Sequence, residues 1–93
     1  MPRMTHMVKS WPHQFIAVKA GMKVAELRKN DRDYVVGDHM VLNEYDPTTE
    51  KYSGRTVEVE ITHKLDKNNV CAVSKMALSD DYAILSVKLL EEN

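Results

Sequence analysis

TVEVEITHKL, the stretch at residues 56–65, has the clearest alternation of apolar and polar side chains in the chain. Because successive side chains of a strand point to opposite faces, this period of two predicts a strand with one buried face. The face expected to be buried consists of Val57, Val59, Ile61, His63 and Leu65. One buried face and one solvated face are typical of an antiparallel sheet.

Further strands are expected on both sides of this segment, separated from it by turn-forming residues. The turn signals are DPTT at residues 46–49, SG at 53–54 and KNN at 67–69. The additional strands are expected at His6–Lys9, Lys23–Arg28, His39–Tyr45 and Tyr82–Leu90. Residues 70–78 fit either a short strand or a helical turn.

Alternation also predicts the buried faces of two of these other strands. In the strand at residues 23–28, Ala25 and Leu27 are expected to face the core, and Glu26 and Arg28 the other side. In the last strand, the expected core face consists of Ala83, Leu85, Val87 and Leu89.

One main helix is expected at about residues 11–20. Ser10 offers a hydroxyl as the N-cap, and Pro12 lies in the first turn, where its missing N–H costs nothing. Gly21 tolerates the left-handed conformation that ends many helices. The sequence therefore predicts an α+β fold: a small, mostly antiparallel β-barrel of five or six strands with one main helix.

Length and composition narrow the class of protein further. The chain has 93 residues, of which 43% are hydrophobic and 29% charged, so we expect one folded domain, residues 1–93, with a small core. No apolar run approaches the roughly 18 residues of a membrane span, and no signal segment opens the chain. With Cys71 as its single cysteine, we expect a cytoplasmic protein without disulfides, metal or cofactor.

The net charge of −1 conceals an uneven distribution of charge along the chain. Residues 1–32 hold seven Lys and Arg against two acidic residues, whereas residues 33–93 hold six against twelve. Such an asymmetry favours an electropositive site built from the first third of the chain.

GMKVAELRKNDR, at residues 21–32, is the segment richest in candidate binding residues. Glu26 and Arg28 are two residues apart on a strand and project from the same face, where they suit a base edge or a phosphate. Lys23 lies at the corner between helix and strand. The alternative is a surface ion pair, which contributes about 0–1 kcal/mol.

Other residues are weaker candidates for a site. Trp11 fits either base stacking or packing of the helix, and Tyr34, Tyr45 and Tyr52 fit stacking or partial burial. The four histidines lack the spacing of metal ligands, and residues 30–33 lack the glycine and distal glutamate of a calcium loop.

The same residues resemble a known family, the ASCH domains of the PUA-like superfamily, and in particular a small subgroup of uncharacterised bacterial and phage proteins. The motifs that carry the resemblance are His6-x-x-Lys9-x-Trp11-Pro12, Gly21-x-Lys23-x-x-Glu26-x-Arg28-Lys29-Asn30-Asp31-Arg32-Asp33 and Val36-Gly37-Asp38. The resemblance implies a small barrel with a helix beside it. It also implies a cleft between barrel and helix, where Lys23, Glu26 and Arg28 face RNA or a nucleotide.

One enzymatic branch of this family hydrolyses an acylated cytidine with a lysine, a threonine and a glutamate. The lysine position matches Lys23, but Glu26 stands where the threonine would be, so the hydroxyl is missing. Glu26 remains a candidate general base that activates water.

We therefore expect a non-enzymatic module that binds RNA or a nucleotide. The expected binding residues are Lys23, Glu26, Arg28, Lys29, Asn30, Arg32, Trp11 and Lys9. One alternative is a small hydrolase of a modified nucleoside, with Lys23 and Glu26 as catalytic residues. Another is a regulatory domain that binds proteins through the acidic residues Glu44, Asp46, Glu50, Glu58 and Glu60.

Overall fold

The computed structural model describes residues 4–69 and 81–90. These residues contain five strands and one helix. In chain order they are β1 (Thr5–Ser10), α1 (Pro12–Lys19), β2 (Ala25–Lys29), β3 (His39–Asp46), β4 (Lys51–Leu65) and β5 (Tyr82–Leu89). The prediction for residues 70–78 lies outside the described residues.

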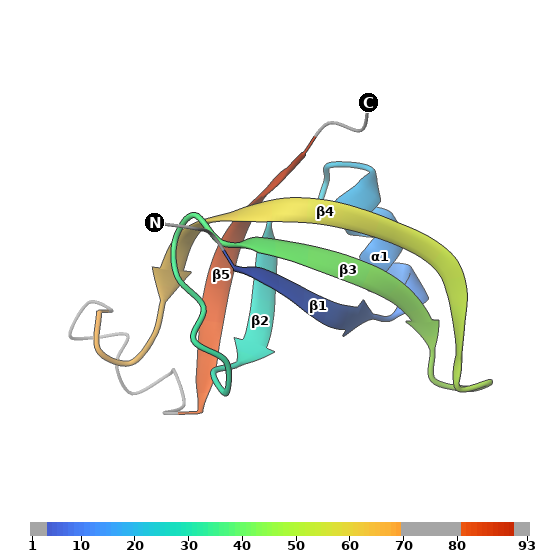
Figure 1. The fold of residues 1–93 in the computed structure, drawn as a ribbon, viewed down its shortest axis with the longest axis horizontal. Helices are drawn as coiled ribbons and strands as arrows, with labels where there is room; N and C mark the ends of the chain where they lie inside the picture. The colour runs from blue at the N-terminus through green and yellow to red at the C-terminus, as the bar shows by residue number, and fades with distance from the viewer. Residues whose placement is uncertain (1–3, 70–80, 91–93) are drawn as a thin grey trace.

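The strands form a single curled sheet in the order β1-β3-β4-β5-β2. Three neighbouring pairs are antiparallel, and β1 pairs with β3 in parallel because α1 and β2 intervene between them. Figure 1 shows that β2 and β5 run across the direction of β1 and β3, which gives the sheet the shape of a half-barrel. The predicted small α+β fold with a curled, mostly antiparallel sheet and one helix is thus confirmed.

The concave side of the sheet holds the core. The register places Met40 of β3 opposite Val59 of β4, and the two side chains are fully buried. From α1, Phe15 and Val18 add to this core. The remaining buried apolar residues are Val8, Tyr34, Leu42, Val57, Ile61, Ala83, Leu85 and Val87.

Helix α1 is shorter than predicted and begins differently. Trp11, not Ser10, is the N-cap, and no side chain caps the first turn. Ser10 instead ends β1, where its buried Oγ has no hydrogen-bond partner among the described residues. Gly21 follows the helix with φ of 78°, as expected of a residue that ends a helix in the left-handed region.

The buried face of β4 ends earlier than its alternation predicts. Val57, Val59 and Ile61 are buried as expected, but His63 is exposed. A register shift between Ile61 and His63 places Lys64 opposite the buried Leu85. Because an extra residue in a strand reverses the faces beyond it, the predicted inward positions of His63 and Leu65 are wrong.

Strand β2 faces the opposite way from the prediction. Leu27 is 63% exposed, whereas Glu26 is only 2% exposed. Pairing with β5 places Glu26 opposite Leu85 and Arg28 opposite Ala83, on the concave side. Glu26 can face the core because Lys23 and Arg28 compensate its charge. The spacing of apolar residues cannot predict this, since it takes no account of ion pairs.

Asp38 ties the loop after β2 to the start of β1. Its carboxylate accepts hydrogen bonds from the backbone N–H groups of Met4 and Val35, and His6 Nε2 lies 2.9 Å from its Oδ2. Burial alone would raise the pKa of Asp38, but these hydrogen bonds outweigh it and lower the pKa. The carboxylate therefore holds two chain segments together while it is ionised.

We predict that Asp38→Asn lowers the free energy of unfolding by about 1–3 kcal/mol at pH 7, because three donors lose a charged acceptor. The loss is full above the ordinary aspartate pKa of 3.8. It shrinks as the pH falls through the lowered pKa of the folded state, where wild-type Asp38 becomes protonated too. Urea denaturation at several pH values measures this, with the exposed Asp33→Asn as control. A loss of equal size at pH 3 and pH 7 would contradict it.

Candidate functional site

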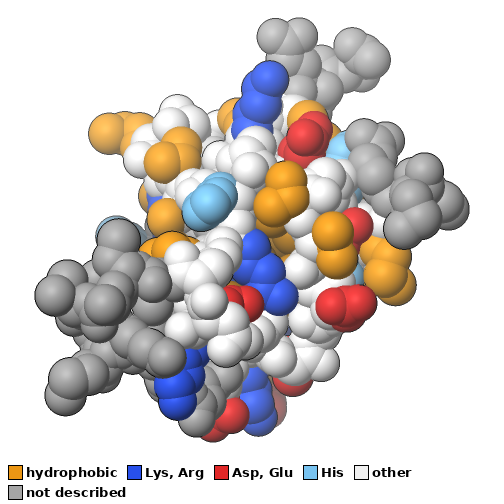
Figure 2. Space-filling view, turned by 90° about the vertical axis from the view of Figure 1, so that its left-hand side faces the viewer, with side chains coloured by type: hydrophobic (Ala, Val, Ile, Leu, Met, Phe, Trp, Pro, Cys, Tyr) orange, Lys and Arg blue, Asp and Glu red, His pale blue; other side chains and the backbone are white. Residues whose placement is uncertain are grey.

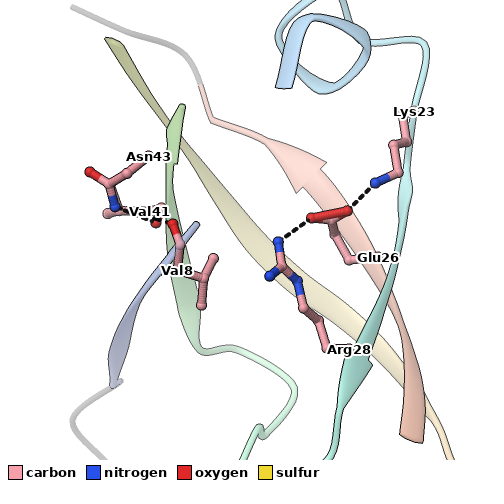
Figure 3. A network of polar contacts seen from close by, with 6 residues as sticks. All are labelled: Val8, Lys23, Glu26, Arg28, Val41 and Asn43. Atoms are coloured by element: carbon pink, nitrogen blue, oxygen red, sulfur yellow. Dashed lines mark hydrogen bonds and ion pairs between the residues drawn. The ribbon is translucent and has the colours of Figure 1, made fainter. Parts of the chain in front are cut away.

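Glu26 lies between two cations at the start of β2. Its Oε1 accepts a hydrogen bond from Arg28 Nη2 at 2.9 Å, and its Oε2 accepts one from Lys23 Nζ. The Glu26 side chain is 3% exposed, whereas those of Lys23 and Arg28 are 26% and 22% exposed. Figure 3 shows both cations pointing toward the carboxylate from either side. This buried arrangement replaces the surface ion pair considered from the sequence.

A cavity of about 650 Å³ lies beside Arg28, which forms part of its lining. It lies between β1 and the end of β2, the two outermost strands of the sheet, and the loop that follows β2 also contributes. The charged residues of its lining are Lys9, Arg28, Lys29, Arg32 and Asp31. Four cations against one carboxylate make it electropositive.

The rest of the lining is aromatic, amide and apolar. It consists of Met7, Val8, Tyr34, Asn43 and Tyr52. Asn43 Nδ2 donates to the backbone oxygens of Val8 at 3.3 Å and Val41 at 3.2 Å, as Figure 3 shows. Since the amide nitrogen is engaged twice, the Asn43 Oδ1 is left as an acceptor.

Arg32 links the loop that follows β2 to strand β1 at the cavity. Its Nη1 donates to the backbone oxygen of Met7 at 3.0 Å, although the two residues are far apart in sequence. Behind it, burial raises the pKa of the Tyr34 hydroxyl, and the charges of Arg32 and Arg28 oppose that effect. The Tyr34 hydroxyl is therefore neutral at physiological pH.

The structure brings together some of the predicted site residues and separates others. Lys9, Arg28, Lys29 and Arg32 line the cavity. Glu26 and Lys23 are not part of the lining, but Glu26 binds Arg28, and Lys23 binds the other oxygen of Glu26. Trp11 and Asn30 are not part of the lining. The indole of Trp11 is 59% exposed at the start of α1. No α1 residue lines this cavity, so it differs from the cleft between barrel and helix that the resemblance implied.

Asn43 and the backbone of β1 were not identified from the sequence as parts of a site. Neither carries a motif, and both reach the cavity through the curl of the sheet. Tyr34 and Tyr52 were considered for stacking, and only the fold shows that they line the same cavity.

One face of the molecule carries charges of both signs. Figure 2 shows Lys and Arg side chains interspersed with Asp and Glu side chains on one face of the molecule. Residues 4–69 and 81–90 contain no group of three or more His, Cys, Asp or Glu that could hold a metal ion. Their helix is too short to cross a membrane.

We predict that Glu26→Gln lowers the free energy of unfolding by about 1–3 kcal/mol, because two partly buried cations lose their shared carboxylate. Chemical denaturation at pH 7 measures the effect. The control is Glu50→Gln, at an exposed position of the turn between β3 and β4. Equal stability of the two variants would show that the Glu26 contacts do not hold β2 in place.

Comparison with known proteins identifies the family. A family model described as a domain of unknown function, DUF3850, matches residues 5–87. A protein of Escherichia phage P2, described as an uncharacterized 12.9 kDa protein in the GpA 3' region, is 41% identical over 61 residues. The match covers 66% of this chain and 54% of the phage protein, so the chain matches about half the length of that relative. Because the family model spans most of the chain, the protein belongs to the DUF3850 family.

Proposed function

We propose that this protein binds RNA or a nucleotide in the cavity between β1 and β2. The observation that carries the proposal is the lining of four cationic side chains and one carboxylate. The volume of about 650 Å³ falls within the usual range of about 300–1,000 Å³ for small-ligand sites. A ligand with phosphate groups complements both the charge and the size.

The cations are suited to different parts of such a ligand. Glu26 and Lys23 hold Arg28 in one orientation, so its guanidinium loses little freedom when it contacts a phosphate. Lys29 is exposed at the end of β2 and adds charge at the cavity mouth. In this proposal Lys23 and Glu26 are positioning residues that act through Arg28.

The neutral lining residues offer an aromatic ring and a hydrogen-bond acceptor to a nucleotide base. Tyr52 offers an aromatic ring for stacking, and Asn43 Oδ1 offers an acceptor for an amino group. The resemblance to ASCH domains supports the same class of ligand, RNA or a nucleotide, although it implies a cleft beside the helix. The mixed charges of Figure 2 favour a compact site over a broad nucleic-acid surface.

The geometry favours binding over hydrolysis of a modified nucleoside. Glu26 is the candidate base of that alternative, yet both its oxygens accept hydrogen bonds from cations and it is 2% exposed. A general base needs an oxygen within reach of the water that it activates. Incubation with acylated nucleosides, followed by mass spectrometry, tests this alternative, and turnover that Glu26→Gln abolishes would establish it.

Two of the acidic residues considered for binding a protein partner contact side chains of this chain instead. Arg55 binds the buried Glu44 through two hydrogen bonds of 2.8 and 2.7 Å. Glu58 contacts His39, with 2.5 Å between Oε2 and Nδ1. These contacts favour structural roles for Glu44 and Glu58 over recognition of a partner.

We predict that fluorescein-labelled single-stranded RNA binds with an affinity that falls as salt rises, because cations at the cavity displace counterions from the phosphates. Replacement of one contacting cation in Lys29→Gln is expected to weaken binding at low salt and to reduce the salt slope by about 0.7. Fluorescence anisotropy at several salt concentrations measures both quantities.

Lys88→Gln is the matched control, since it removes the same charge from an exposed position of β5 outside the cavity lining. We expect it to bind RNA as the wild type does. Salt-independent affinity, or equal losses in the two variants, would argue against the proposed site.

A further inference from the structure

A second, smaller cavity adjoins the first. Its volume is about 270 Å³, and Tyr52 lines both cavities. The end of β3 and the start of β4 form most of its wall, with Thr49 of the turn between them and Pro12 of α1. Tyr52 is thus the residue that the two linings share, and its side chain marks the boundary between the two cavities.

Tyr52 is suited to stacking at this boundary. It lies opposite Tyr45 in the pairing of β3 with β4, and the two ring centres are 5.0 Å apart at an interplanar angle of 63°. Lys9 Nζ lies 4.2 Å from the centre of the Tyr45 ring and holds that ring in turn. Although Tyr45 supports it, Tyr52 remains 57% exposed, so ring surface is available to a ligand.

The two cavities differ in charge. The first is lined by four cations and one carboxylate, whereas the second contains Glu44 and Asp46 with Lys51 as its only cation. Hydrogen bonds from Arg55 lower the pKa of Glu44, and hydrogen bonds from Thr48 lower the pKa of Asp46. Both carboxylates are ionised at neutral pH. Because Arg55 binds both oxygens of Glu44, Asp46 is the carboxylate of the second cavity that can accept a hydrogen bond from an amino group.

We infer that the two cavities hold neighbouring nucleotides of one single strand. The first takes the phosphate backbone, Tyr52 stacks on a base, and the second takes a base that carries an exocyclic amino group. This inference rests on the proposed function and deepens it, since it names a strand of at least two nucleotides as the ligand. Cytosine, adenine and guanine have the required amino donor, whereas uracil does not.

The test compares ligands of increasing length on the folded protein. Isothermal titration calorimetry with cytidine monophosphate and with a cytidine trinucleotide gives the two affinities for the wild type, Tyr52→Ala and Tyr52→Phe. We expect the wild type to bind the trinucleotide at least about tenfold more tightly, since stacking on one aromatic side chain contributes a factor of about 5 to 150. Tyr52→Ala should remove that advantage, and Tyr52→Phe should retain it. Thermal denaturation confirms that the variants are folded.

The preference for one base over another tests the role of the second cavity independently. A uridine trinucleotide is expected to bind the wild type more weakly than the cytidine trinucleotide, and the same amount of charge in both makes them matched ligands. Equal affinity for the two would overturn the assignment of an amino group to the second cavity.

The remaining outcomes separate this inference from the proposed function. If the monophosphate and the trinucleotide bind equally well, or if Tyr52→Ala weakens both to the same extent, the inference of two neighbouring nucleotide sites is wrong. Binding of a nucleotide in the cationic cavity is then still supported. If neither ligand binds, the proposed function fails and the inference fails with it.

Discussion

The burial of Glu26 between Lys23 and Arg28 is the interaction on which the arrangement of β2 depends. A lone carboxylate on the concave side of the sheet would lose its hydration without replacement, at a cost of several kcal/mol. The two cations supply that replacement, one on each oxygen. Strand β2 can therefore turn a polar face inward, and the sheet at this edge encloses a charged cavity next to the apolar core.

The loop between β2 and β3 completes that cavity, and its position depends on a second buried carboxylate. Asp38 binds the backbone of Met4 and Val35 and contacts His6 of β1. Nearer to β2 in the same loop, Arg32 donates to the backbone of Met7. Because the loop is held at both places, Arg32, which follows β2 in sequence, lies against β1 in space.

The small net charge of the chain is consistent with a cluster of cations at one cavity. A net charge of −1 and the interspersed charges of Figure 2 give long nucleic acids little unspecific attraction. Four basic residues of the first third, Lys9, Arg28, Lys29 and Arg32, line one cavity, and Glu44 and Asp46 of β3 line its smaller neighbour. This distribution suits a short ligand that is recognised in one orientation.

Local sequence patterns were enough to predict the element types, because alternation and turn residues are local, and they located β1, α1, β3 and β5 closely. Strand β4 was predicted only from residue 56, although it begins at Lys51 and includes the SG pair at 53–54. The same patterns drew attention to residues 23–32, which supply Arg28, Lys29 and Arg32 to the cavity lining. They misassigned the faces of β2 and of the end of β4. Periodicity records polarity, whereas the partners of Glu26 and the irregularity after Ile61 decide which side is buried. Asn43, Tyr52 and the edge of β1 join those cations only in the folded chain, since the curl of the sheet brings its two outermost strands to one cavity.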